Sequence, residues 1–446
     1  MTDTIQRSLP PRVELARPMS SAVDPTWGGA VWVGAVDLAE VPGDDAGTVG
    51  LHDAAGHRSA RLLVRDGVAP LGFVDLPVSD ETIEVAALRA AVAALPAVPQ
   101  PPIPVRLPST SVVLCTRDRA DQLGAALDSL LALDHPDFEV VIVDNAPSDE
   151  STRELVEALD DDRVRYVREP VPGLSSARNA GVLAARHEIV AFTDDDVVVD
   201  RAWLRAVASG FSRGDDVVCV SGLVASGELR TPTQRYFDER VTWSRNLVPR
   251  VHRLSAPPVD RPLFPFAVGD YGTGANFAMR RSAITELGGF DEALGVGTVT
   301  GGGEDIDMFS RVVLSGAALV VEPAALVWHR HRADLPALRK QAEGYGTGLG
   351  AWLTKIALHP RTLGMALQRA PRAVRHLVSG TAAEPAVTPA AAPVAVGTAD
   401  APLDDAAFLR EVGRMRWVEL LAVGRGVLRY GRSRRTVRAR ERTANR

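Results

Sequence analysis

The chain has 446 residues, of which 46% are hydrophobic and 24% charged, so it can form two or three domains with apolar cores. This composition excludes a wholly disordered or fibrous protein. The formal net charge of −6 gives the whole molecule no electrostatic reason to bind nucleic acid. Two cysteines, Cys115 and Cys219, provide neither a disulfide framework nor a four-ligand zinc site.

The first part of the chain is predicted to be a small β-rich module over residues 1–100. Short β-like runs occur at residues 30–36, 60–64 and 71–76, separated by Gly, Asp and Pro. A proline-rich connector at residues 96–108 then marks the first domain boundary.

Neither a targeting segment nor a membrane span is expected. The first 20 residues lack a basic start followed by an apolar stretch, and no run of about 18 apolar residues occurs. We therefore expect a cytoplasmic protein without a membrane span.

Residues 105–332 alternate between β-branched runs and helix-like stretches. The β-branched runs cover residues 111–116, 139–144, 164–167 and 188–193. This alternation predicts an α/β domain in which helices cover both faces of a mostly parallel sheet. Ligands of such domains bind at the C-terminal ends of the strands, where polar residues follow several of these runs.

Three consecutive carboxylates, Asp194, Asp195 and Asp196, follow the fourth run. Like charges this close raise one another's pKa unless a cation lies among them. Asp194 and Asp196 can point the same way and bind Mg²⁺ or Mn²⁺ beside a diphosphate. The alternative is an acidic turn that caps the following helix.

A second acidic pair, Glu304 and Asp305, follows three glycines at the predicted start of a helix. Glycines let the backbone approach a ligand closely, and a carboxylate at a helix N-terminus is held anionic, as a proton acceptor should be. The alternative is that Asp305 only caps the helix.

Two histidines and one arginine are further candidates. His329 and His331 flank Arg330 at the end of an apolar run, and on a strand both imidazoles would share a face. Either one could complete the metal site or meet phosphates. Arg178, near the start of a predicted helix, offers a guanidinium for phosphate or base recognition, or is a surface residue.

These residues belong to an ordered set of short motifs across about 220 residues. The set is Thr116-Arg117, Asp144-Asn145, Arg178-Asn179-Ala180-Gly181, Asp194-Asp195-Asp196, Gly274-Ala275-Asn276, Gly288-Gly289-Phe290-Asp291-Glu292, Gly303-Glu304-Asp305 and Trp328-His329. Together they resemble family-two glycosyltransferases of the GT-A fold.

The resemblance implies inverting transfer of a sugar from a nucleotide-diphospho sugar to an acceptor hydroxyl. By analogy, the expected roles are nucleobase binding for Asp144, contacts around the nucleoside for Thr116, Arg117 and Arg178, and contact with the ribose or sugar for Asp195. The expected ligands of Mn²⁺ or Mg²⁺ are Asp194, Asp196 and His329. Asp305 would take the proton of the acceptor hydroxyl, and Glu304 would help to position it.

The resemblance further suggests synthesis of a bacterial surface polysaccharide, a glycolipid or a small-molecule glycoside. Residues 413–417 carry Gly where membrane-bound synthases of the family have the Gln of their Gln-x-x-Arg-Trp signature, which disfavours processive synthesis. Two other hypotheses remain: a sugar nucleotidyltransferase, although no glycine follows the first strand, and a catalytically silent nucleotide-sugar-binding scaffold.

The C-terminal part divides into a helical extension at residues 333–379, an Ala/Pro-rich linker at 380–402 and a basic helix at 403–446. The expected apolar stripe of this helix is Phe408, Met415, Val418, Leu421 and Leu428. Twelve arginines against five acids give the segment a net charge of about +7. We interpret it as a solvated helix, a docking helix for a partner, or a peripheral element on the anionic inner face of a membrane. In each case we expect it to be dispensable for chemistry.

Overall fold

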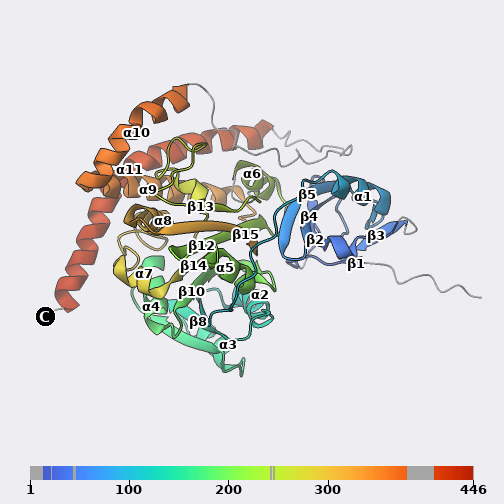
Figure 1. Cartoon of the computed structure of the whole chain (residues 1–446), viewed down its shortest axis with the longest axis horizontal. Helices are drawn as coiled ribbons and strands as arrows, with labels where there is room; N and C mark the ends of the chain where they lie inside the picture. The colour runs from blue at the N-terminus through green and yellow to red at the C-terminus, as the bar shows by residue number, and fades with distance from the viewer. Residues whose placement is uncertain are drawn as a thin grey trace, which may run out of the picture.

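The computed structural model describes residues 14–378 and 406–444, apart from residues 22, 44–46, 242, 243, 245 and 246. The predicted linker at 380–402 lies outside the described residues. A large central sheet has the β-rich N-terminal part on one side and the long C-terminal helices on another (Figure 1).

The central sheet is mixed but mostly parallel. Its strands are β7 (Thr110–Thr116), β8 (Phe138–Asn145), β9 (Val164–Glu169), β10 (Ile189–Asp194), β11 (Val197–Val199), β12 (Val217–Ser226), β13 (Arg250–His252), β14 (Asn276–Arg280) and β15 (Ala318–His329). They lie in the order β11-β15-β12-β14-β10-β7-β8-β9, and β13 also pairs with β15. Only β14, β11 and β13 run against the direction of the other strands.

Helices cover both faces of this sheet, as the sequence predicted. They are α2 (Ala120–Leu131), α3 (Ser151–Glu157), α4 (Leu174–Ala184), α5 (Trp203–Phe211), α6 (Pro232–Arg240), α7 (Arg281–Glu286) and α8 (Glu304–Ser315). Leu127 of α2 and Trp203 of α5 are buried in the core on one face. Ala177 of α4 and Phe309 of α8 are buried in the core on the other. The predicted α/β class is confirmed.

In its described residues, the N-terminal part contains two three-stranded sheets, one α-helix and one short 3-10 helix. Its elements are β1 (Glu14–Leu15), β2 (Val31–Asp37), η1 (Leu38–Glu40), β3 (Thr48–Leu51), β4 (Ser59–Asp66), β5 (Ala69–Pro77), β6 (Thr82–Glu84) and α1 (Val85–Ala93). The sheet orders are β1-β3-β6 and β2-β4-β5. We call residues 14–93 the N-terminal module.

The N-terminal module packs directly against the central sheet. Val31 of β2 and Leu63 of β4 share a buried apolar cluster with Leu326 and Trp328 of β15. The backbone N–H of Val31 also donates to the carbonyl oxygen of Leu229, at 2.9 Å. The module therefore abuts β15, which ends at a predicted metal ligand, His329.

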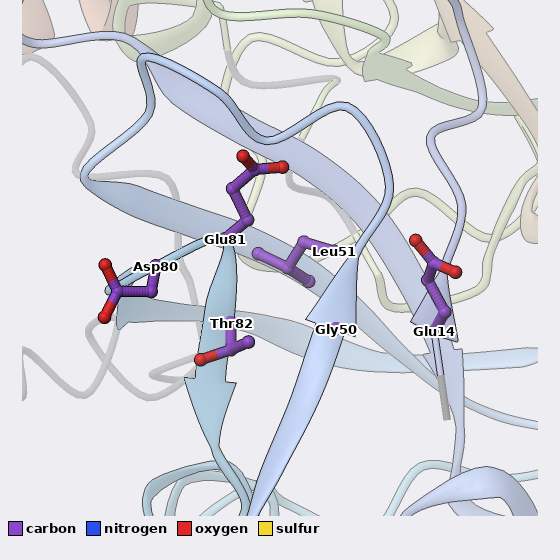
Figure 2. A pocket seen from close by; sticks show the side chains of 6 residues that line it. All are labelled: Glu14, Gly50, Leu51, Asp80, Glu81 and Thr82. Atoms are coloured by element: carbon purple, nitrogen blue, oxygen red, sulfur yellow. The ribbon is translucent and has the colours of Figure 1, made fainter. Parts of the chain in front are cut away.

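The other sheet of the module borders an acidic pocket of about 310 Å³. Figure 2 shows Glu14, Asp80 and Glu81 around it, with Thr82 on β6. These acids belong to the β1-β3-β6 sheet and its turn, whereas the module contacts the central sheet through β2 and β4.

The C-terminal helices are α9 (Leu335–Leu358), α10 (Pro360–Val378) and α11 (Ala406–Ala444). Helix α11 lies along α9 (Figure 1). Glycines line the contact: a Cβ at Gly350 of α9 would collide with the carbonyl oxygen of Val423 of α11. None of the described helices is long and apolar enough to cross a bilayer.

The predicted apolar stripe of the last helix is only partly correct. Phe408 and Met415 are buried, but Leu421 and Leu428 are 62% and 80% exposed. Small residues, including Ala422 and Gly426, occupy the α9 contact instead, so α11 packs closely without large side chains there.

Candidate active site

The predicted site residues lie at one edge of the central sheet. Because β7, β8, β10 and β15 run in the same direction, their C-terminal ends carry Thr116, Asp144, Asp194 and His329 to that edge. Strand β14 runs oppositely and begins there, immediately after Gly274 and Ala275. This is the edge at which α/β sheets bind ligands.

The middle carboxylate of the acidic triplet is held by the segment after β7. Asp195 accepts hydrogen bonds of 2.8 Å from both the Thr116 hydroxyl and the Arg119 guanidinium. Arg119 was not among the predicted site residues, although it lies in the same short stretch as Thr116. The predicted donor-binding residue Arg117 is half exposed and pairs only with Asp118 among the described contacts, at 3.6 Å.

Asp144 is a buried carboxylate with one free acceptor atom. Its Oδ2 accepts a hydrogen bond of 2.9 Å from the Tyr166 hydroxyl. Its Oδ1 is buried and has no hydrogen-bond partner among the residues that the structure describes. Burial raises the pKa of Asp144, against the opposing effect of the Tyr166 hydrogen bond. A buried acceptor without a hydrogen bond destabilises the folded protein. A ligand N–H placed at Oδ1 would provide the missing bond.

The last carboxylate of the triplet faces an imidazole. Asp196 Oδ1 lies 3.2 Å from His329 Nε2, and its Oδ2 lies 3.4 Å from Arg332. Burial raises the pKa of Asp196, but His329 and Arg332 outweigh this effect and hold that pKa below its ordinary value. Conversely, burial lowers the pKa of His329, but Asp196 outweighs it and raises that pKa.

The first carboxylate, Asp194, lies nearer to Arg178. The two groups are 3.8 Å apart, and burial raises the pKa of Asp194 to about 6. In the part of the chain that the structure describes, no three His, Cys, Asp or Glu side chains already converge on one metal position. The predicted three-residue ligand set is therefore not preassembled.

Asp196 and His329 nevertheless fit a divalent cation. Their facing oxygen and nitrogen atoms offer two ligands, and Mg²⁺ is usually bound through one or two carboxylates plus substrate phosphates. Imidazole together with carboxylate also suits Mn²⁺. Asp194 remains 30% exposed and can reach a cation that enters with a diphosphate.

The glycine run places an acidic pair at the start of α8, as predicted. Gly303 precedes the helix with a φ of 94°, and a Cβ there would lie 2.7 Å from the carbonyl oxygen of Gly348 on α9. Asp305 Oδ2 accepts a hydrogen bond of 2.8 Å from the backbone N–H of Gly274, and its Oδ1 accepts one from Ile306. The carboxylate is thus held between α8 and the start of β14.

Glu304 is buried and paired with Arg178. The Arg178 guanidinium donates to Glu304 Oε1 at 3.1 Å and to the carbonyl oxygen of Gly274 at 2.9 Å. Burial and the adjacent Asp305 raise the pKa of Glu304 to about 7, although Arg178 opposes this. We expected Arg178 beside the nucleoside, but it is buried and links Asp194 with Glu304.

Residues 111–288 match the family described as "Glycosyl transferase family 2". This part of the chain is therefore similar to family 2 glycosyltransferases. The matched residues run from β7 through the acidic triplet to Gly274 and beyond. They therefore include most of the polar residues at this edge of the sheet, whereas Glu304, Asp305 and His329 follow the matched part.

Two curated relatives share 30% identity with the chain. One is the pre-mycofactocin glycosyltransferase of Mycobacterium tuberculosis, which aligns over 53% of this chain and 46% of its own length. The other is the succinoglycan biosynthesis protein ExoO of Rhizobium meliloti, which aligns over 50% of this chain and 61% of its own length. The chain thus spans about half the length of these relatives.

The chain was also matched to solved structures of two glycosyltransferases. A mannosyltransferase from Pyrobaculum calidifontis, in complex with GDP-Man and Mn²⁺, is 21% identical and covers 76% of this chain and 92% of its own, with a TM-score of 0.46. GalNAc-T7 with UDP, GalNAc and Mn²⁺ is 18% identical and covers 56% of this chain and 51% of its own, with a TM-score of 0.39.

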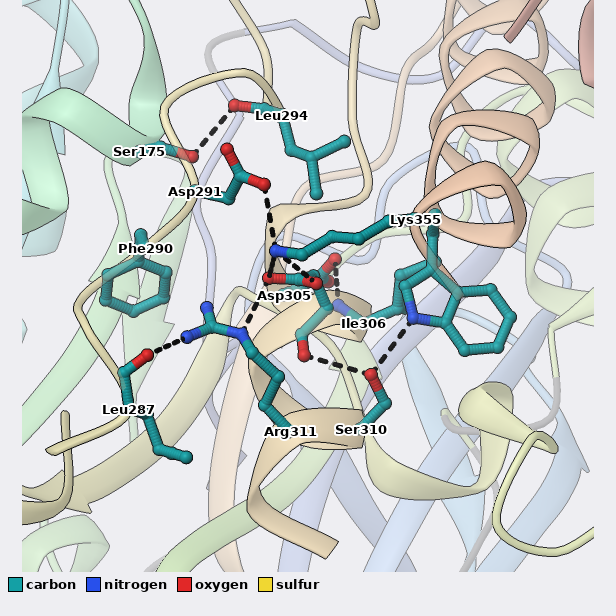
Figure 3. A network of polar contacts seen from close by, with 12 residues as sticks. Ser175, Leu287, Phe290, Asp291, Leu294, Asp305, Ile306, Ser310, Arg311 and Lys355 are labelled. Atoms are coloured by element: carbon teal, nitrogen blue, oxygen red, sulfur yellow. Dashed lines mark hydrogen bonds and ion pairs between the residues drawn. The ribbon is translucent and has the colours of Figure 1, made fainter. Parts of the chain in front are cut away.

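A partly buried ion-pair network connects helix α8 to the C-terminal helix α9 (Figure 3). Lys355 of α9 lies 2.8 Å from Asp291 and 2.8 Å from Asp307 of α8. Tyr430 and Arg434 of α11 also donate to Asp291, at 3.2 and 3.4 Å. Helix α11 therefore contacts Asp291, which shares Lys355 with Asp307 in the first turn of α8. From the sequence we expected this helix to lie apart from the catalytic residues, beyond a linker.

Proposed function

We propose that the protein transfers a sugar from a nucleotide-diphospho sugar to an acceptor hydroxyl, with inversion at the anomeric carbon. The observation that carries this proposal is the position of Asp305, a partly exposed carboxylate held by the Gly274 N–H on the same sheet edge as the Asp196–His329 pair. One edge of the sheet thereby offers both a proton acceptor and a cation site.

Donor binding is assigned to the residues after β7 and β8. The unpartnered Oδ1 of Asp144 would accept a hydrogen bond from the nucleobase. Thr116 and Arg119 hold Asp195, which would meet the ribose or the sugar. Arg117, which is half exposed, would lie beside the nucleoside.

Mn²⁺ or Mg²⁺ would be held by Asp196 and His329, with Asp194 completing the set once the donor diphosphate is present. When bound, the cation neutralises charge that develops on the leaving diphosphate. Asp194 and Asp196 also become less repulsive toward each other when a cation lies between them.

Asp305 is assigned the role of general base. The acceptor oxygen would form a bond to the anomeric carbon, its proton would pass to the Asp305 carboxylate, and the sugar–phosphate bond would break with its electrons leaving on the diphosphate. Glu304 and Arg178 form the buried ion pair that sets the direction of the first turn of α8. Positioning of this kind raises the effective concentration of the reacting groups.

The proposal is tested by incubating the purified chain with common nucleotide sugars and either Mn²⁺ or Mg²⁺. Release of nucleoside diphosphate, stimulated by a hydroxyl acceptor and lost in Asp305→Asn, supports it. Formation of a nucleotide sugar from a sugar phosphate and a nucleoside triphosphate would instead support a nucleotidyltransferase. Binding of nucleotide sugars without any turnover would support a silent scaffold.

We further propose that α11 contacts an anionic membrane surface on the cytoplasmic side. Trp417, Leu420, Leu421 and Leu428 recur at helical spacing on α11 and are all at least 62% exposed. The segment 403–446 also carries a net charge of about +7, which complements anionic lipid headgroups. This location suits an acceptor in surface polysaccharide or glycolipid synthesis, although a small-molecule acceptor is also compatible with the site.

A further inference from the structure

A continuous series of polar contacts joins the N-terminal module to the proposed metal site. Arg61 of β4 donates to Asp238 Oδ2 at 2.6 Å. Ser226, the last residue of β12, donates to Asp238 Oδ1 at 2.6 Å. Beyond Ser226 the series continues through His331 to His329, whose Nε2 faces Asp196.

Counting hydrogens assigns the tautomers along this series. Ser226 has one hydroxyl hydrogen, which it donates to Asp238, so its oxygen accepts from His331 Nε2 at 2.9 Å. With that hydrogen on Nε2, His331 Nδ1 is an acceptor. It lies 3.0 Å from His329 Nδ1, which therefore carries the hydrogen between the two rings.

With its hydrogen on Nδ1, His329 turns Nε2 toward Asp196 Oδ1, at 3.2 Å: Nε2 donates to this oxygen when the ring is protonated and has a lone pair for a cation when the ring is neutral. A divalent cation that displaces this proton would find the nitrogen and the carboxylate oxygen already facing each other. Metal-binding histidines are usually oriented by a hydrogen bond from their other ring nitrogen, and such partners set both tautomer and ring direction.

We propose that the N-terminal module orients the metal-binding histidine of the catalytic domain through Arg61, Asp238, Ser226 and His331. The inference rests on the proposed function, because it takes Asp196 and His329 as cation ligands. It gives the module a role in the reaction although none of its residues is placed at the reacting atoms.

The burial of the connecting residues makes them suitable for positioning. Arg61, Asp238, Ser226 and His331 are each no more than 8% exposed. Asp75 of β5 fixes the Arg61 guanidinium from its other side through two hydrogen bonds, of 2.8 and 3.0 Å. The apolar contact between β2, β4 and β15 keeps the module in place around this path.

The experiment compares Ser226→Ala with Ser221→Ala in the full chain. Both serines lie on β12, are buried and donate one short hydrogen bond, but Ser221 donates to the carbonyl oxygen of Tyr271, outside the series. Binding of Mn²⁺ alone is measured by electron paramagnetic resonance. Ser226→Ala is expected to weaken Mn²⁺ binding by about 10-fold or more, as is typical for loss of a partner of a metal-binding histidine, and Ser221→Ala is not.

His329→Ala separates failure of this inference from failure of the proposed function. If the wild-type chain binds Mn²⁺ no better than His329→Ala does, the proposed metal site is wrong, and the inference falls with it. If binding depends on His329 but Ser226→Ala and Ser221→Ala bind equally, the metal site stands and only the positioning role is overturned.

The contribution of the module itself is tested by a double-mutant cycle. Arg61→Met should weaken Mn²⁺ binding in the wild-type background and have little further effect in Asp238→Asn, because an amide at this position no longer offers a carboxylate to the guanidinium. Arg61→Lys, which keeps the charge, should recover part of the affinity. If the effects of Arg61→Met and Asp238→Asn on Mn²⁺ affinity are additive, the connection between the module and the metal site is overturned. Thermal unfolding of each variant checks that it is folded.

Discussion

The backbone N–H of Gly274 donates a hydrogen bond of 2.8 Å to Oδ2 of Asp305, across 31 positions of the sequence. This bond joins the start of β14 to the first turn of α8. The bond orients the Asp305 carboxylate, and the amide oxygen of an asparagine could accept the same bond. Substitution by asparagine therefore removes the charge of the side chain while keeping its orientation.

Asp305→Asn is accordingly expected to keep its geometry and its affinity for the donor but to lose transfer by about 100-fold or more. Calorimetry with the nucleotide and turnover assays on the same sample check both parts. Glu304→Gln is the comparison: if it abolishes turnover while Asp305→Asn does not, the proton acceptor is Glu304.

Glu304 also predicts a pH dependence of stability. Because the pKa of Glu304 is raised from 4.5 to about 7, the folded chain binds more protons than the unfolded chain between these values. This group therefore contributes most stability below about pH 4.5, and the contribution falls as the pH rises toward 7. The difference in melting temperature between the wild type and Glu304→Gln should decrease as the pH rises from 4.5 to 7. A difference that stays constant or increases with pH would show that the pKa of Glu304 is not raised.

Asp144→Ala is expected to weaken nucleotide binding by about 10- to 100-fold, because a hydrogen bond to a charged group contributes about 1.5–3 kcal/mol. Tyr166→Phe is the graded control: it removes the hydroxyl that contacts Oδ2 but keeps the free Oδ1. Calorimetry should therefore show a smaller loss for Tyr166→Phe. Equal losses in both variants would indicate that Asp144 acts only through Tyr166.

Lys355→Met is expected to lower the free energy of unfolding by about 2 kcal/mol, because Asp291 and Asp307 lose their shared cation and keep only Arg434 and Arg311 as cationic partners. Lys340, the only other lysine, is exposed on the same helix and offers a matched control. Lys340→Met should change stability by less than about 0.5 kcal/mol in denaturant titrations. Similar changes in the free energy of unfolding for the two variants would show that the ion-pair network does not stabilise α8.

Leu421→Ser with Leu428→Ser should reduce sedimentation with anionic liposomes while leaving turnover on a soluble acceptor unchanged, because both side chains are exposed and face away from α9. Leu183→Ser, at an equally exposed leucine on α4, is the control. Liposome binding that is unchanged in the double variant, or that the wild type lacks even at low salt, would exclude α11 as a membrane contact.

Local patterns were sufficient to predict four strands of the central sheet, β7 to β10, and the residues at their ends. The observed strands β7, β8, β9 and β10 differ from the predicted runs by two residues or fewer at each end. Their β-branched runs encode a buried strand independently of their partners, and parallel pairing then places Thr116, Asp144 and Asp194 at one edge. The candidate acids could be recognised for the same reason.

The partners of these residues depended on tertiary structure. Arg178 has the sequence context of a phosphate ligand, but its burial against Glu304, 126 positions away, makes it an internal counter-ion. The face that α11 turns to α9 could not be predicted either, because glycines and alanines in close contact leave no hydrophobic periodicity.

The amino-acid sequence by itself determined an α/β domain with acids at the strand ends, because hydrophobic periodicity and short motifs act over a few residues. Only the tertiary structure decided which histidine faces Asp196 and what holds it. Arg61 and Asp238 are 177 positions apart, and no local pattern relates them. Their ion pair exists because the β2-β4-β5 sheet packs its apolar face on β15 and brings a buried arginine to a buried carboxylate.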